Sequence, residues 1–168
     1  MPKVVVANAG PLMALAKLNL LHLLKQLYGS VHFPRSVYDE VVVQGMQGGH
    51  EDAHTLHRFL SKEGWSPTDV SDLPEALAGA ALDRGERDSI ALALSQAGLL
   101  LMDEERGRAA ASQLDVPVHG TLGVLIQAYH GGLITADQLR FYFGQIEEHS
   151  DIWISSILVR RLAREVLG

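Results

Sequence analysis

Two short apolar runs, VVVA at residues 4–7 and LLLM at residues 99–102, each lead directly into a polar residue and then into a helical pattern. Continuous aliphatic runs of this length are typical of strands that are buried on both faces. A further run, VPVH at residues 116–119, precedes another helical pattern. Strands that alternate with helices require right-handed crossovers and a parallel sheet. We therefore predict an α/β fold, a three-layer α/β/α sandwich with a small parallel sheet of four or five strands.

The helical patterns between these runs supply the outer layers of the predicted sandwich. Residues 19–28 are expected to form a helix that Asn19 begins and Gly29 ends. Residues 31–33 are predicted as a short strand, and Pro34 opens the next helix. Further helices are expected at about residues 51–62, 86–98, 106–114 and 121–130, and the last third of the chain is predicted to be helical.

The length and composition of the chain set its class. A chain of 168 residues with 47% apolar and 20% charged residues is expected to form a single globular domain over residues 1–168. No apolar run reaches the roughly 18 residues of a membrane span, and no signal-peptide pattern follows the first apolar run. The absence of cysteine excludes disulfides and thiolate metal sites, and we expect a cytoplasmic protein.

The formal net charge of -6 restricts the kind of nucleic-acid partner. A protein that only coats nucleic acid carries a basic surface, because neutralisation of phosphates drives that binding. A metal-dependent nuclease is compatible with an acidic chain, since its carboxylates add negative charge until cations bind.

Acidic and amide side chains are expected to meet at one edge of the predicted sheet. Asn8 follows the first strand, and Asp103 follows the LLLM strand. Glu86 and Asp88 lie in the first turn of the preceding helix, and Glu40 lies in the helix that Pro34 opens. Carboxylates that converge repel one another, which calls for a hard cation such as Mg²⁺ or Mn²⁺. The pattern therefore indicates metal-dependent hydrolysis of a phosphodiester.

Each of these residues also has a simpler structural explanation. Glu86 and Asp88 suit the positive end of a helix dipole. Asp103 can cap the next helix, and Glu40 can lie on a solvated helix face. It is the joint placement of these residues that favours a site.

Two stretches of the chain stand out, DRGERDSIALAL and LLLMDEERGRAAASQLDVPVHGTLGVLIQA. They are the main carriers of a resemblance, over roughly residues 4–134, to the PIN-domain superfamily, and more narrowly to its prokaryotic branch of uncharacterised PIN-like nucleic-acid-binding proteins, relatives of VapC-like toxins. It implies the α/β/α fold, divalent-metal ribonuclease activity on RNA, and frequent pairing with a small antitoxin protein.

The resemblance also implies roles for particular residues. Asn8 matches the first acidic position of the superfamily, Glu40 the second, Asp88 the third and Asp103 the fourth, with Glu86 close to the third. These residues are the expected catalytic and metal-binding set. Asn8 departs from the pattern, because an amide keeps one coordinating oxygen but lacks the charge. This departure leaves two hypotheses open, an active ribonuclease and a non-catalytic module that binds RNA or protein.

Two other patterns bear on binding. Arg106 and Arg108 can contact RNA phosphate beside the acidic site, or they can lie on an exposed helix start. Thr121 begins a helix whose backbone amides can hold a phosphate, or it can simply cap that helix. The HEDAH stretch, which starts at His50, matches the H-E-x-x-H pattern of zinc peptidases, but it falls where a helix is only beginning.

The amphipathic C-terminal segment suggests a partner surface. Its apolar residues exceed what a peripheral helix of a small monomer usually buries, and we expect a homodimer. The same residues can instead close the back of the core. They are Ile154, Ile157, Leu158, Leu162 and Val166.

Overall fold

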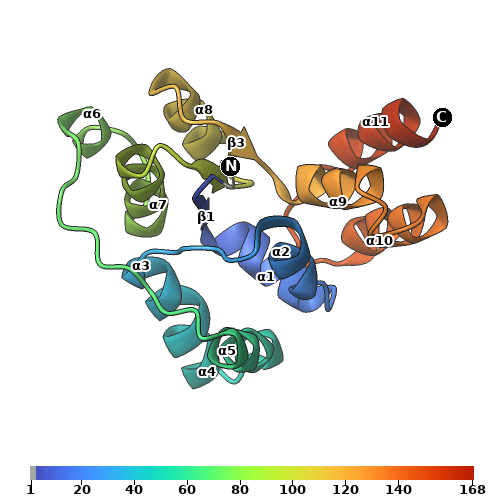
Figure 1. Ribbon diagram of the computed structural model, residues 1–168, viewed down its shortest axis with the longest axis horizontal. Coiled ribbons are helices and arrows are strands. Elements are labelled where there is room, and N and C mark those ends of the chain that lie inside the picture. Colours follow the sequence, from blue (N-terminus) through green and yellow to red (C-terminus); the bar gives the residue numbers. More distant parts are fainter. Residues whose placement is uncertain (1–2) are drawn as a thin grey trace.

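A parallel three-stranded sheet lies at the centre of the computed structural model, which describes residues 3–168 (Figure 1). Its strands are β1 (Val5–Ala7), β2 (Leu99–Leu101) and β3 (Val118–His119), in the order β1-β2-β3. Val6 pairs with Leu100, and Leu100 pairs in turn with Val118. Because all the strands run in the same direction, their carboxyl ends share one edge of the sheet.

Successive side chains of the strands enter two separate apolar clusters. Val5, Ala7 and Leu101 belong to one cluster, whereas Val6 and Leu100 belong to the other. This alternation is the two-residue period of a strand, and both clusters are buried because helices cover both faces. The predicted three-layer α/β/α sandwich is confirmed.

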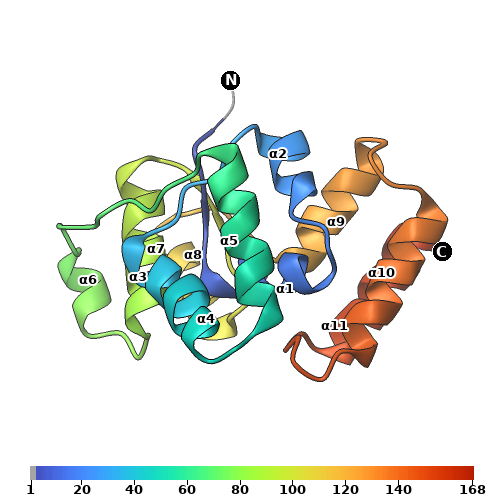
Figure 2. The same ribbon diagram turned by 90° about the horizontal axis from the view of Figure 1, so that it is seen from below.

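The helices divide between the two faces of the sheet (Figures 1 and 2). The smaller apolar cluster contains side chains of α6 (Glu75–Ala78), α7 (Arg84–Ser95) and α8 (Glu105–Gln113). The larger cluster takes its side chains from α1 (Ala9–Lys17), α2 (His22–Tyr28), α3 (Arg35–Tyr38), η1 (Asp39–Gln44), α5 (Glu51–Glu63), α9 (Thr121–His130), α10 (Ala136–Glu148) and α11 (Ser156–Leu167). A short helix, α4 (Gly45–Gln47), joins η1 to α5.

The sheet is smaller than predicted. Residues 31–33 form a single bridge, Val6 with His32, in place of a strand. The amide of Ala7 donates to the carbonyl of His32 at 2.8 Å, so the segment still borders β1. It cannot extend as a strand because Pro34 caps α3 directly after it.

The prediction that a helix begins at Asn19 is wrong by about one turn. Asn19 has a φ of 59°, in the left-handed region, and α2 begins at His22. Asparagine tolerates this conformation better than most residues, so Asn19 ends the turn after α1. Gly29, with a φ of 78°, ends α2 as expected.

The C-terminal helices pack partly on the body of the protein, at the end of the molecule away from α6 (Figure 2). Leu158, Leu162 and Val166 are partly buried against the larger apolar cluster. Of the five residues expected at a dimer surface, Ile157 is the one that is mainly exposed, at 82%. Most of this apolar face therefore closes the protein's own core. Within residues 3–168, no helix combines the length and apolar character needed to cross a bilayer.

The close approach of β1 and β2 depends on Gly98. A Cβ at this buried position would overlap the backbone carbonyl oxygen of Val4, which cannot move without breaking the strand pairing. We expect Gly98→Ala to lower the free energy of unfolding by about 1–3 kcal/mol, the usual cost of overpacking. Chemical denaturation measures it.

Gly144→Ala is the matched control, because Gly144 lies inside α10 with nothing within 4 Å of an added Cβ. Alanine there is expected to raise the free energy of unfolding by about 0.5–1 kcal/mol through helix propensity. Equal effects of the two substitutions would contradict the strand-contact explanation.

Candidate active site

The site begins at the carboxyl ends of β1 and β2. Asn8 directly follows β1, and its backbone amide donates to the backbone carbonyl of Leu101 at 2.9 Å. Its side chain is 6% exposed, and Ser89 donates from Oγ to its Oδ1 at 3.2 Å. Asp103 lies two residues beyond the end of β2. The prediction that Asn8 and Asp103 follow adjacent parallel strands is confirmed.

The start of α9, directly after the third strand, fixes the carboxylate of Asp103. The amide of Thr121 donates to Asp103 Oδ1 at 2.7 Å, and its hydroxyl donates to Oδ2 at 2.6 Å. Thr121 is the first residue of α9 and directly follows Gly120. A Cβ on Gly120 would lie 2.8 Å from both Asp103 Oδ1 and Arg108 Nη1, so a larger residue would displace the carboxylate. Asp103 is therefore held in one orientation before any ligand arrives.

The start of α7 supplies two further carboxylates. Asp83 caps the helix, accepting from the amide of Glu86 at 2.8 Å, and the amide of Asp83 donates to Glu86 Oε1 at 3.0 Å. This reciprocal capping box holds Glu86 at the site, where it is 9% exposed. Asp83 was absent from the expected set, although its spacing to Glu86 is the capping-box signal.

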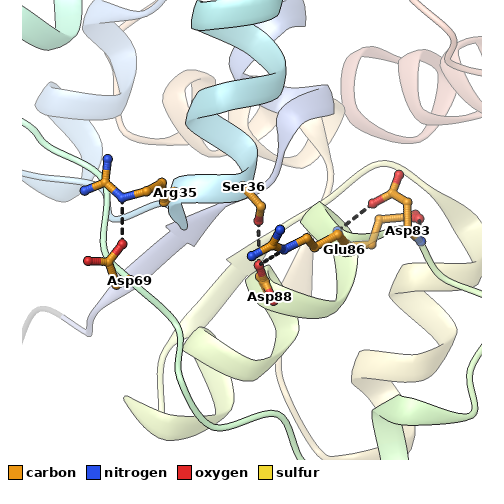
Figure 3. A network of polar contacts seen from close by, with 7 residues as sticks. Arg35, Ser36, Asp69, Asp83, Glu86 and Asp88 are labelled. Atoms are coloured by element: carbon orange, nitrogen blue, oxygen red, sulfur yellow. Dashed lines mark hydrogen bonds and ion pairs between the residues drawn. The ribbon is translucent and has the colours of Figure 1, made fainter.

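Asp88 lies on a different side of α7 from Glu86. Two residues along a helix correspond to a rotation of about 200°, which turns Asp88 away from the site. Asp88 Oδ2 accepts from Ser36 Oγ at 2.6 Å and lies 3.7 Å from Arg84 Nε. Figure 3 shows this contact between α3 and α7 together with the Asp83–Glu86 pair. The structure thus brings Glu86 to the site in the place where the resemblance implied Asp88.

A cavity of about 270 Å³ connects these groups. Its wall takes Glu40 from η1 and Glu104 from the start of α8. A π-helical segment such as η1 is frequent at functional sites, because it shifts the side chains that follow it. The oxygen-bearing side chains that line the cavity are Asn8, Glu40, Asp83, Glu86, Asp103, Glu104 and Asp151.

Burial raises the pKa of three of these carboxyls, and repulsion by neighbouring carboxylates adds to the effect at two of them. Burial raises the pKa of Glu40, and the charge of Asp83 adds to the effect. Burial also raises the pKa of Glu86, with the carboxylates of Asp83 and Glu104 contributing. Burial raises the pKa of Asp103, although the bonds from Thr121 and the charge of Arg108 oppose it. The cavity therefore holds negative charge at a cost in free energy, which a cation would relieve.

The donor set of the cavity fits a hard divalent cation, since carboxylate and amide oxygens are the ligands that Mg²⁺ and Mn²⁺ prefer. Among the residues that the structure describes, however, no three acidic or histidine side chains lie close enough together to hold an ion as they stand. Binding would require some of the carboxylates to turn inward. The same finding covers the histidines of HEDAH, where His50 caps α5 and His54 is exposed on that helix.

The expected substrate-binding residues have different surroundings. Arg106 is exposed on α8 and does not line the cavity. Arg108 is partly buried, and its Nη1 donates to the carbonyl of Met102 at 3.1 Å beside the site. Thr121 is fully buried, and both of its polar groups hold Asp103, so its position is that of a support for the carboxylate.

Comparison with known proteins places this chain in a family. A family profile described as PIN domain matches residues 4–167, nearly the whole chain, and the chain therefore belongs to the PIN-domain family. PIN domains are generally nucleases and typically use divalent metals. The chain showed no significant similarity to a curated protein or to a solved structure.

The raised pKa of Glu40 predicts a pH-dependent stability in metal-free buffer. The folded protein holds this proton more tightly than the unfolded chain, so the destabilisation is present near neutral pH, shrinks as the pH falls, and is lost below the ordinary pKa of 4.5. We expect Glu40→Gln to raise the thermal midpoint at pH 7, with the gain shrinking as the pH falls. Thermal denaturation across this range measures it.

Burial and the charge of Arg108 lower the pKa of His119, so His119 makes the protein less stable as the pH falls, opposite to Glu40. Because the wild type and Glu40→Gln both contain His119, its effect cancels in the difference between their thermal midpoints. Glu75→Gln is the control, because Glu75 is an exposed acid on α6 away from the cavity. A difference for Glu40→Gln that did not change with pH would contradict the burial of its charge.

Proposed function

We propose that this chain is a divalent-metal-dependent endoribonuclease that hydrolyses RNA phosphodiesters with Mg²⁺ or Mn²⁺. The observation that carries the proposal is the convergence of Asn8, Glu40, Glu86 and Asp103 on one cavity at the carboxyl edge of the sheet of a PIN domain. The raised pKa values of its carboxyls support the same conclusion, because a bound cation would lower the free-energy cost of the negative charge at this site.

The side chains have distinct parts in this proposal. Glu86 and Asp103 are the first candidates to hold the cation, with Glu40 and Asn8 completing the oxygen donors. When bound, a divalent cation supplies an acidified water nucleophile and neutralises charge at the phosphodiester. Thr121 keeps the Asp103 carboxylate in place, and the capping box keeps Glu86 in place. Arg108 lies where it can pair with a phosphate beside the acidic cavity.

A second candidate function is a non-catalytic module that binds RNA or a protein and has a weakened metal site. Asn8 favours it, because the amide removes one charge from the position nearest to β1. The wide spacing of the carboxylates among the described residues also favours it. Binding of RNA without cleavage would distinguish this function from the first.

The proposal extends to a toxin-type role with a small antitoxin protein, to a homodimer and to a cytoplasmic location. Exposed apolar side chains on the C-terminal helices support a protein contact, since Phe141 is 61% exposed and Ile157 is 82% exposed.

Cleavage of RNA with Mn²⁺ or Mg²⁺ tests the function, and a pair of variants tests the site. Glu86→Gln keeps the capping box, because glutamine serves equally at this position, but removes a charge from the cavity. We expect it to reduce the cleavage rate by roughly 10- to 100-fold, the scale of losses at metal sites.

Asp88→Asn is the matched control, because asparagine can still accept the hydrogen bond from Ser36. We expect this variant to keep most of the activity. The opposite ranking would restore Asp88 as the acidic residue that α7 contributes. A wild-type protein that binds RNA but cleaves none with either metal would favour the non-catalytic module.

Asn8 offers a test of the metal site that does not depend on activity. Asn8→Asp adds a carboxylate beside Glu86 and Asp103, so we expect tighter Mn²⁺ binding in calorimetry and a lower thermal midpoint without metal. Gln113→Glu, which adds the same charge on the exposed end of α8, is the control. If Asn8→Asp changes neither quantity, Asn8 is only a turn residue.

A further inference from the structure

A second, larger space opens beside the acidic cavity, and we call it the groove. It has a volume of about 740 Å³ and lies between α11 on one side and the region of β3, α8 and α9 on the other. It shares four lining residues with the acidic cavity: Asp103, Glu104, Trp153 and Ile154. The two spaces are therefore continuous, and a linear molecule in the groove would pass directly to Asp103.

The groove carries both charges: Glu104 and Glu105 line it together with Asp103, and two arginines line it as well. Arg108 lines it from α8 and Arg161 from α11. The nearest partner of Arg161 is Glu165, at 3.9 Å in an exposed pair that contributes little energy. Arg161 is therefore available to an anionic ligand. The groove also has an apolar floor, to which Leu122 and Ile126 of α9 and Leu158 of α11 contribute.

Trp153 stands where the two spaces join, and its side chain is 89% exposed. The segment that carries it is anchored, because Ile152 is 7% exposed and Asp151 pairs with Lys17 at 3.2 Å and with His149 at 3.0 Å. An anchored segment that presents an indole to solvent forgoes the free energy of burying that ring, so the ring is available as a contact surface.

These features match the way in which proteins bind single strands of nucleic acid. Such sites combine cationic side chains that follow the phosphates with aromatic rings on which unstacked bases lie. The bases of a duplex are already stacked and cannot reach the indole. A protein segment could use the apolar floor, but the arginines and the path to Asp103 favour a polyanion.

We propose that this groove binds a single-stranded RNA segment, with Trp153 stacking on a base next to the acidic cavity and Arg161 pairing with a phosphate. The proposal rests on the ribonuclease function in naming RNA as the ligand, and it assigns the strand specificity to residues outside the acidic site. It also gives the direction in which the substrate enters, along α11 towards Asp103.

Tryptophan fluorescence gives a direct test. The chain has two tryptophans, and Trp65 packs edge-on against Phe59 with ring centroids 5.3 Å apart. In a Trp65→Phe background, Trp153 is the one tryptophan left, and excitation at a wavelength that the four tyrosines do not absorb makes its emission the observed signal. A short oligouridylate added in EDTA, which prevents metal-dependent cleavage, is expected to quench this emission. The same strand annealed to oligoadenylate is expected to quench it much less.

Variants measured by fluorescence anisotropy of a labelled oligouridylate complete the test. Trp153→Ala is expected to weaken binding by roughly tenfold, whereas Phe141→Ala, which removes an exposed aromatic ring outside the groove, leaves it unchanged. Arg161→Gln is expected to reduce the salt dependence of log Kd by about 0.7, the value of one phosphate contact with a single strand. Arg164→Gln, on the same helix but outside the groove lining, is the charge control.

Equal binding by Trp153→Ala and Phe141→Ala, or equal binding of single strand and duplex, overturns the proposal. A sedimentation change in Trp153→Ala without an RNA effect also overturns it and assigns the groove to protein association. This test can be told apart from the test of the ribonuclease function. RNA binding that depends on Trp153, with no cleavage in Mn²⁺, refutes the ribonuclease function alone. RNA cleavage that is unchanged in Trp153→Ala refutes RNA binding in the groove alone.

Discussion

The parallel register of the three strands is the constraint on which the rest of the site depends. Because Ala7 pairs with Leu101 and Leu101 pairs with His119, the three strands end at the same level of the sheet. Asn8, Asp103 and Thr121 follow these positions within two residues. A parallel sheet thus brings together side chains that are far apart in the sequence, from the beginning, middle and later part of the chain. The hydrogen bonds from Thr121 to Asp103 are a direct product of this register.

The acidic cavity is a compromise between stability and binding. Its carboxylates are partly removed from water, and burial is the main cause of each raised pKa. The protein offsets part of this cost locally, through the amide of Thr121 at Asp103 and the helix cap at Glu86. The neutral amide of Asn8 lowers the repulsion further. The remaining electrostatic cost makes the site responsive to a cation.

The position of Trp153 depends on the C-terminal helices α10 and α11, between which it lies. Lys17 links the segment before Trp153 to α1, and Lys17 also lies 3.5 Å from Asp52 of α5. The segment before Trp153, which borders the acidic cavity, is thereby tied to α1, the helix that directly follows Asn8. Changes in this connection would affect the groove and the cavity together.

Much of this arrangement follows from the sequence alone. The VVVA and LLLM runs indicated two buried parallel strands, because short β-branched or aliphatic runs followed by helical patterns are typical of strands covered on both faces. The placement of Asn8 and Asp103 at one edge followed from that. The sequence did not determine a full strand at His32, since Pro34 stops it at a single bridge. Nor did it determine which acid of α7 enters the cavity, because Glu86 and Asp88 differ by half a helical turn whose rotation is set by packing against Ser36 and Asn8. The joining of the groove to the cavity was decided only by tertiary structure, since Trp153 and Asp103 are distant in sequence and meet through the packing of α11.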